Sequence, residues 1–352
     1  MHQKLSNGKL RELEKASGGD WGGTQVDKRF LAMLSEVLGR ETMTRFHKEC
    51  ISDVFDLLKE FETAKRTISF DTSGTIKVRL PVKLHEIKVE QEKSICTDTQ
   101  LRRSFSKTIN SSKFGNMISI RGDKLRVDAD FAKDMFSYSI NELIKCIRDL
   151  FEEADVAVVD TIIVVGGFSE CALVQHAFNT SFPTKKIVFP SEAGLVVLKG
   201  AVLYGHNPKI VDSRKARFTY GIKSTAMFDP TIHNKKYKFV RNGVEMCNNL
   251  FQVYVKKGAS VHCGYTISEK HIPSREEVQG GYTSFCMYMS NDVSPTYVTE
   301  PSCFFLGTLE VKMPEDENKA YETSFVFGDT ELMLVVRHLH SGKMFSKYFN
   351  FC

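Results

Sequence analysis

The chain lacks the features that mark membrane-spanning, secreted and disulfide-stabilised proteins. No apolar run among its 352 residues approaches the roughly 20 that are needed to span a bilayer. The N-terminal stretch MHQKLSNGKLRELEKASGG is polar and charged, which excludes a secretory signal and a transit peptide. The nine cysteines are scattered and form no C-x-x-C pair, so we expect reduced thiols, no metal site and a cytoplasmic location.

A strong excess of one charge is also missing. Lysine and arginine number 48 against 43 acidic residues, and the net charge of +5 is too small for this length to indicate nucleic acid as a partner. Hydrophobic residues make up 42% and charged residues 26%, which is ordinary for a globular protein. The length predicts about two domains.

Helices and strands alternate in the first part of the chain. An apolar run over 160–165 fits a buried parallel strand. Residues 75–84 alternate like a strand that continues a hairpin around Asp71–Gly74. This alternation predicts an α/β layer with a parallel sheet. The predicted helices cover residues 26–38, 51–68, 131–151, 170–178 and 191–204, the last closed by Gly205 at its C-cap.

The pattern changes near residue 212. From Thr219 onward, short runs rich in Tyr, Phe, Val and Thr are separated by turn residues at fairly regular spacing. Such runs predict an antiparallel β-domain. We place the boundary in the polar, basic stretch 212–217.

One predicted helix, Ile51–Ser69, carries a polar face opposite its apolar stripe. Glu62, Lys65, Arg66 and Ser69 fall at i, i+3, i+4 and i+7 on that face. The face is either solvated, with an intrahelical Glu–Arg pair, or it binds a ligand. In the second interpretation the Glu and Lys bond ribose hydroxyls, the Ser bonds a base edge and the Arg stacks on a base.

Two glycine pairs stand at strand-to-helix turns. Gly166-Gly167 follows a predicted strand, where glycines let the backbone approach a ligand closely. Gly22-Gly23-Thr24 is similar to phosphate-cradling loops, but no G-K-[ST] follows. Both pairs are equally consistent with tight connections. No Ser/His/Asp or Cys/His arrangement is present, so no catalytic residue is predicted.

Three segments in order resemble the second half of the ATPase domain of the seventy-kilodalton heat-shock family. They read ASGGDWGGTQVD at 16–27, FETAKRTIS at 61–69 and IVVGGFSE at 163–170. The divergent member-12 branch of that family is the most similar, and later phrases such as EAGLVVLKGAVLYGHNP and FGDTEL resemble it as well.

The resemblance implies a fold and a division of the chain. Residues 1–212 would form lobe II of an actin-like, ribonuclease H-like ATPase, with an inserted subdomain at roughly 31–128. Residues 213–352 would form a β-rich C-terminal domain. The family's first lobe would precede Met1, so we expect no ATP hydrolysis by this chain alone, since phosphoryl transfer needs a complete clamp around the γ-phosphate.

The resemblance also implies a nucleotide site for ATP or ADP, with magnesium bound only through the nucleotide. Two departures affect it: Glu170 stands where the family has an arginine that stacks on adenine, and Phe168 replaces a small hydroxyl residue and would form an apolar wall. By resemblance, Glu62 and Lys65 would hold the ribose, Arg66 and Ser69 the base, Gly166 and Gly167 would pass under the nucleotide, and Gly22 and Gly23 would lie near the phosphates.

Three functions remain open at this point. The first is a heat-shock-like chaperone relative that binds ATP or ADP weakly, with protein clients at the β-rich domain. The second is a non-catalytic protein-interaction module that has lost nucleotide binding. The third is another actin-like enzyme such as a sugar kinase, which the β-rich region and KASGGDWGGT fit less well. Neither nucleic acid nor a membrane is expected as a partner.

Overall fold

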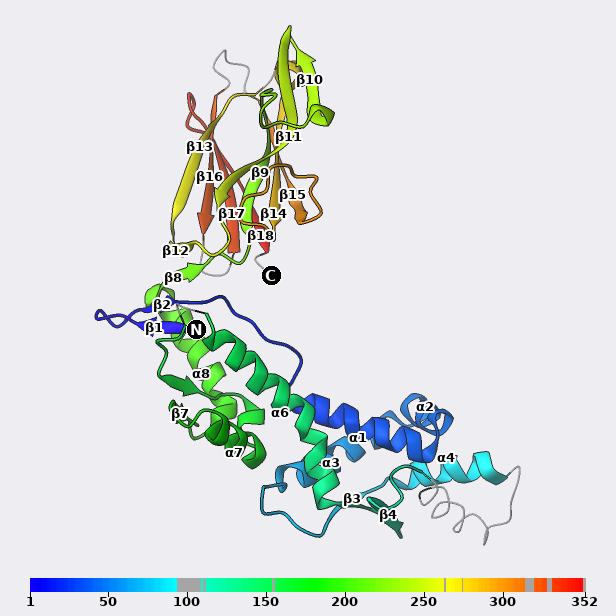
Figure 1. Cartoon of the computed structure of the whole chain (residues 1–352). Coiled ribbons are helices and arrows are strands. Elements are labelled where there is room, and N and C mark those ends of the chain that lie inside the picture. Colours follow the sequence, from blue (N-terminus) through cyan, green and yellow to red (C-terminus); the bar gives the residue numbers. More distant parts are fainter. Residues whose placement is uncertain are drawn as a thin grey trace. The chain divides into compact units, whose positions relative to one another are not determined.

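The computed structural model describes residues 1–93, 109, 112–153, 156–262, 264–273, 275–313, 320–327 and 331–350. The chain is mixed α/β and divides into two compact units, which Figure 1 shows in sequence colours. One unit is Ser17–Val202, and the other combines Met1–Ala16 with Leu203–Cys352. This division differs from the predicted boundary at 212, because the first residues pair with a strand near that boundary.

Helices dominate the first part of the unit Ser17–Val202. Each buries an apolar face in one shared core, in which Phe30 and Phe61 stack with ring centroids 3.8 Å apart. Asp128 caps the longest helix, because its carboxylate accepts from the backbone N–H groups of Asp130 and Phe131. The helices are α1 (Gly23–Leu38), α2 (Arg40–Glu49), α3 (Ile51–Arg66), α4 (Val82–Lys93) and α6 (Ala129–Phe151).

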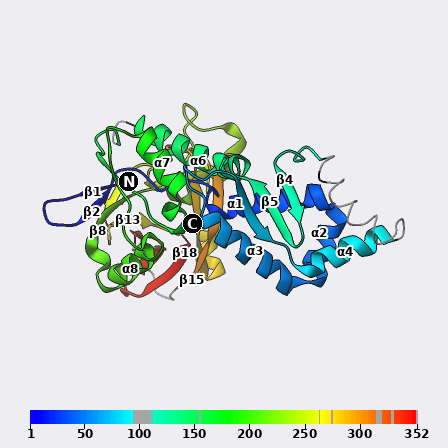
Figure 2. The same ribbon diagram turned by 90° about the horizontal axis from the view of Figure 1, so that it is seen from below.

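A three-stranded antiparallel sheet packs against these helices. Its order is β3 (Thr75–Arg79), β5 (Lys124–Asp128) and β4 (Ile118–Arg121). Helices α3 and α6 contact the sheet, and Figure 2 shows it beside α1 and α3.

The predicted strand 75–84 is correct over its first half only, and the predicted hairpin is wrong. The strand ends at Arg79, and α4 begins at Val82, directly after Pro81. Leu80, Leu84 and Ile87 are buried at helical spacing, which the alternation had concealed. Residues 71–74 connect α3 to β3, with Gly74 at φ +77°, and the partner of β3 is the distant β5.

A parallel strand pair completes this unit. β6 (Thr161–Ile163) pairs with β7 (Lys186–Val188), as the alternating pattern predicted. The 3₁₀ turn η1 (Gly167–Glu170) and α7 (Ala172–Ser181) lie between them. α8 (Ala193–His206) follows and continues through Gly205, so the predicted C-cap is wrong: Gly205 has no positive φ and the helix ends at His206.

The other unit begins with a small sheet. Its order is β1 (His2–Lys4), β2 (Leu10–Glu12), β8 (Val211–Lys215) and β12 (Ser260–His262), and β2 and β8 run parallel. This pairing places the N-terminal residues with the C-terminal part of the chain. A 3₁₀ turn, η2 (Pro208–Ile210), leads into β8.

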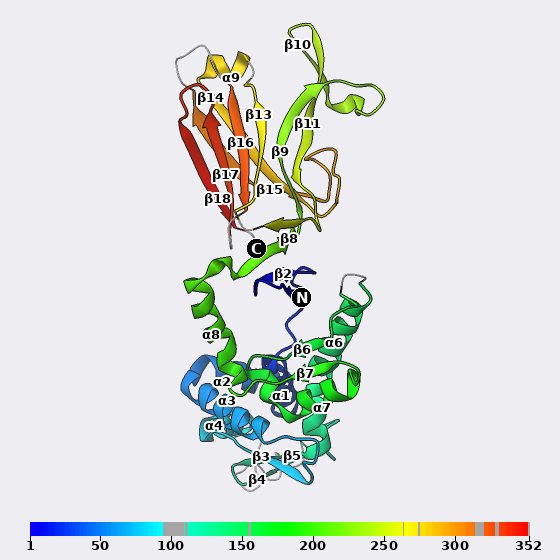
Figure 3. The same ribbon diagram turned by 90° about the vertical axis from the view of Figure 1, so that its left-hand side faces the viewer.

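The rest of this unit is an antiparallel β-sandwich, as the sequence predicted. Figure 3 shows its two sheets as separate layers. The side chains of Phe285, Phe325 and Leu334 are buried in the core of this unit. The short elements η3 (Lys235–Tyr237) and α9 (Arg275–Gly280) lie in connections. One sheet has the order β10 (Lys238–Arg241), β11 (Val244–Val255), β9 (Thr219–Met227), β14 (Tyr282–Ser290), β15 (Cys303–Lys312), and the other β13 (Thr266–His271), β16 (Tyr321–Phe327), β17 (Glu331–His338), β18 (Met344–Asn350).

Within the part of the chain that the structure describes, none of the helices combines the length and the apolar character that crossing a bilayer requires.

Candidate nucleotide site

The C-terminal end of α3 presents the predicted polar face. Leu57, Phe61 and Ala64 are buried in the core, which turns Glu62 and Arg66 outward on the opposite side of the helix. Arg66 Nε donates to Glu62 Oε1 over 2.8 Å, so the intrahelical pair of the first interpretation exists. The same face also carries contacts to two other segments.

Lys65 joins α3 to the start of α1. Its Nζ lies 2.7 Å from Asp27 Oδ1, 2.5 Å from Glu62 Oε2 and 3.4 Å from the carbonyl oxygen of Gly23. The side chain is only 9% exposed. An ammonium has three hydrogens to donate, and these three oxygens account for all of them. Lys65 therefore fixes the position of Glu62 against the N-terminus of α1.

Arg66 joins α3 to the loop after β6. Its Nη1 lies 3.4 Å from Glu170 Oε2, and Glu170 Oε1 accepts from the backbone N–H of Gly194 over 3.2 Å. Gly194 stands in the first turn of α8, where a helix favours a negative charge. Glu170 thus connects the end of α3 to the beginning of α8.

The pKa values of the paired groups reflect these contacts. Burial raises the pKa of Glu62, but hydrogen bonds from Lys65 and Arg66 outweigh it and hold the pKa below its ordinary value. The hydrogen bond to Glu62 raises the pKa of Arg66. Both groups are therefore charged across the physiological range.

The glycines border open space at this junction. A Cβ added at Gly22, Gly166 or Gly167 would meet no atom within 4 Å. At Gly23 it would lie 3.4 Å from Phe168 Cδ2 and 3.5 Å from Lys65 Nζ, which is ordinary van der Waals contact. Gly166 has φ +92°, a backbone conformation that glycine adopts readily.

The N-terminus of α1 has the character of an anion-binding end. Gly22 caps the helix without a side-chain hydrogen bond, and the first turn holds no acidic residue. The backbone N–H of Gln25 donates to the Gly22 carbonyl oxygen over 3.0 Å, and the helix dipole favours negative charge at the N–H groups that precede it.

Two predicted residues lie somewhat apart. The ring of Phe168 is partly buried and packs against two core clusters. It stacks on Phe136, with the ring centroids 6.3 Å apart and an angle of 6° between the ring planes. The Ser69 hydroxyl lies 3.0 Å from Thr72 Oγ1, within the turn that follows α3. Contacts thus link Glu62, Lys65, Arg66, Gly23 and Glu170, whereas Gly22, Gly166 and Gly167 border open space beside them.

Sequence reasoning missed Asp27 and Gly194. Asp27 lies between Val26 and Phe30, both fully buried. A carboxylate beside such core positions needs a cationic partner, and this was the signal available. Gly194 gave no signal, since its role depends on Glu170. In the described residues, no group of three or more His, Cys, Asp or Glu side chains could hold a metal ion.

Comparisons with known proteins agree with the sequence resemblance. No family model matches the chain. It is 28% identical over 340 residues to heat shock 70 kDa protein 12A of Mus musculus, covering 94% of this chain and 49% of that protein. Heat shock 70 kDa protein 12A of Homo sapiens is 27% identical over 340 residues, and heat shock 70 kDa protein 12B of Homo sapiens is 28% identical over 346, with the same coverage. The predicted similarity to the member-12 branch is confirmed, and the chain spans about half the length of these relatives.

Proposed function

We propose that this chain is a heat-shock-70-like protein that binds ATP or ADP between the end of α3 and the loop Gly166–Glu170. One observation carries the proposal: Lys65 and Arg66 connect the start of α1, the end of α3 and the loop after β6. These are the segments that the resemblance assigns to one nucleotide. They are distant in sequence and meet in space.

The residues present fit a nucleotide. The glycines leave room beside the backbone, and the uncapped start of α1 suits phosphate oxygens, with magnesium entering as the nucleotide's own ion. The Arg66 side chain is 62% exposed and can cover a base. Apart from its contact to Thr72, the Ser69 hydroxyl has capacity for a second hydrogen bond.

The two residues assigned to the ribose have different roles. The Glu62 carboxylate receives one bond at each oxygen and retains lone pairs that can accept from ribose hydroxyls. Lys65 donates its hydrogens to protein oxygens, so it acts as a positioning residue that holds Glu62 in place.

The charge of the site predicts weak binding. Three carboxylates, those of Asp27, Glu62 and Glu170, surround the two cations Lys65 and Arg66, which leaves one net negative charge. An anionic nucleotide must also compete with Glu170 for Arg66. These side chains hold a nucleoside and do not surround a γ-phosphate, so we expect no steady-state ATPase from the 352-residue chain.

A titration with fluorescent N-methylanthraniloyl-ADP tests the proposal. We expect saturable binding that Arg66→Ala weakens about tenfold, the loss of one favourable contact of about 1.4 kcal/mol. Arg45→Ala is the matched control, because Arg45 makes the same kind of Nε contact to Glu49, at 3.1 Å, in the same unit. The proposal fails if the unsubstituted chain does not bind, or if both variants bind equally.

A protein-interaction role for the β-sandwich is the second candidate. Apolar side chains lie exposed on two adjacent strands, Phe305 on β15 and Met344 and Tyr348 on β18. With this candidate we propose protein clients, a role in proteostasis and a cytoplasmic location. Suppression of the aggregation of a heat-unfolded enzyme, lost in Phe305→Ser, would support it, and no suppression by the unsubstituted chain would contradict it.

A further inference from the structure

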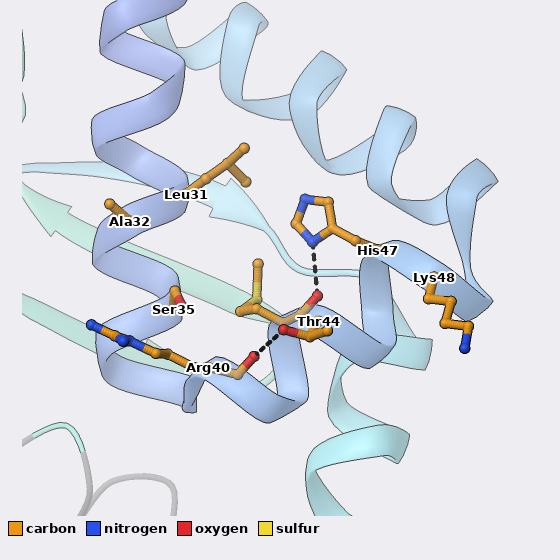
Figure 4. A pocket seen from close by; sticks show the side chains of 8 residues that line it. Leu31, Ala32, Ser35, Arg40, Thr44, His47 and Lys48 are labelled. Atoms are coloured by element: carbon orange, nitrogen blue, oxygen red, sulfur yellow. Dashed lines mark hydrogen bonds between the residues drawn. The ribbon is translucent and has the colours of Figure 1, made fainter.

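A groove of about 660 Å³ separates the second half of α1 from α2, and Figure 4 shows its lining. Leu31 and Ala32 of α1 and Met43 of α2 form an apolar floor. Gly39, at φ +97°, turns the chain between the two helices, which lie at a wide angle to each other in Figure 4. The α1 residues of the groove lie about 12–18 Å along the helix from Gly23, at 1.5 Å per residue, so the groove is separate from the candidate nucleotide site.

Unpaired positive charge surrounds this floor. Arg40 and Lys48 line the groove and are exposed, and neither makes an ion pair within the part of the chain that the structure describes. His47 lines the groove beside them. On the same helix, Arg45 pairs with both Glu49 and Glu90. Among the described residues, the cations of α2 without an ion pair are thus the ones beside the groove.

The hydrogen bonds of the groove leave its basic groups available. His47 Nδ1 lies 2.8 Å from the Met43 carbonyl oxygen, which only accepts, so Nδ1 carries a proton and Nε2 is the ring atom left for a ligand. The Thr44 hydroxyl donates to the Arg40 carbonyl oxygen over 2.8 Å, a bond that does not involve the Arg40 guanidinium. In Figure 4 the Arg40 and Lys48 side chains lie toward opposite sides of the view, and Leu31 lies above them on α1.

From this pattern we propose that the groove binds an acidic amphipathic helix of a protein partner. Arg40 and Lys48 are eight positions apart on α2, which is about 12 Å along the helix. A bound helix that carries two carboxylates two turns apart places one carboxylate at Arg40 and the other at Lys48. Apolar side chains in the turn between them then meet Leu31 and Met43.

The apolar floor favours a peptide over nucleic acid. Single-stranded nucleic acid binds through aromatic side chains on which bases stack, together with a basic track for the phosphates. Here the surface between the cations is aliphatic, and the single ring in the lining, His47, is held by Met43. Carboxylates on either side of an apolar side chain match both features of the groove.

Fluorescence anisotropy with the full chain tests the proposal. The probe is a fluorescein-labelled, alanine-based helical peptide with two Glu residues two turns apart and two Leu residues between them. We expect the double variant Arg40→Gln/Lys48→Gln to weaken binding about three- to tenfold, the range for two exposed ion pairs. Ala32→Glu should abolish binding, because it places a like charge on the groove floor.

Matched controls separate the groove from general charge attraction. Arg45→Gln removes the same charge from α2 outside the groove and should leave binding unchanged, as should Arg66→Ala in the nucleotide site. The proposal is overturned if a peptide with Gln in place of Glu binds equally well, if Arg45→Gln weakens binding as much as the double variant, or if a polyuridylate oligonucleotide binds in its place. It is also overturned if Ala32→Glu instead abolishes self-association of the chain in sedimentation.

Discussion

Replacing Asp27 by Asn tests whether the Lys65 contact stabilises the unit that contains the candidate site. Lys65 Nζ is 2.7 Å from Asp27 Oδ1, and the two side chains are 9% and 27% exposed. Removing one partner of a fully buried ion pair costs about 3–5 kcal/mol. Because Lys65 keeps Glu62 as a partner, we expect Asp27→Asn to lower the free energy of unfolding by about 2 kcal/mol.

The same helix region provides a matched control. Lys28 Nζ lies 2.8 Å from Asp20 Oδ2, nearly the same distance, but these side chains are 62% and 66% exposed. Solvent screens such a pair, so Asp20→Asn should leave the unfolding midpoint unchanged within error. The two variants remove the same chemical contact and differ in burial.

Urea unfolding followed by tryptophan emission measures the effect. The only tryptophan, Trp21, belongs to Ser17–Val202 and reports on this unit. With a slope of about 2 kcal/mol per molar urea, Asp27→Asn shifts the midpoint down by about 1 M. Adding Lys65→Met should recover part of the loss, since it removes the poorly compensated buried cation. Equal midpoints for Asp27→Asn and Asp20→Asn would refute the reasoning.

Three further predictions address other positions. Glu170→Arg should tighten ADP binding several-fold, because it removes the carboxylate that competes for Arg66 and adds a cation. Glu170→Gln, which only removes the carboxylate, should tighten it less. Unchanged ADP affinity in both variants would count against the site. Burial lowers the pKa of His271 below 6.5, although Glu277 opposes this, so the unfolded chain takes up the proton first and stability falls as the pH drops below about 6.5. In urea unfolding followed by circular dichroism, His271→Phe should lose that part of the pH dependence, which is at most about 1.4 kcal/mol per pH unit. Gly205→Ala should raise stability by about 0.5–1 kcal/mol, because Gly205 is helical; a loss would favour the C-cap predicted from sequence.

Long amphipathic segments were predictable from the sequence. The helix predicted at 131–151 is α6, Ala129–Phe151, and the antiparallel strands predicted after Thr219 include β16, Tyr321–Phe327. In both, one buried face sets the periodicity over many residues. The short segment 75–84 was not predictable in this way, because five strand residues, a proline and the start of α4 together imitate a single alternating pattern.

In the candidate site, too, the residues on one helix face were predictable from the sequence and their distant partners were not. Helix geometry places Glu62, Lys65 and Arg66 on one face, and the structure retains that face. The partners could not be predicted from spacing: Asp27 is 38 residues from Lys65, and Glu170 is 104 residues from Arg66. Which of several carboxylates meets each cation depends on how the segments pack.

Glu170 illustrates why a sequence departure cannot be interpreted from its charge alone. As a replacement for an arginine it only removes a cation from a nucleotide site. In the structure its two oxygens bind Arg66 and the N–H of Gly194, so it connects α3 to α8. The 3.4 Å contact to Arg66 is long and largely exposed, and such pairs contribute at most about 1 kcal/mol. A nucleotide that offers Arg66 an aromatic base therefore has only a weak contact to displace, while the bond from Glu170 to Gly194 can persist.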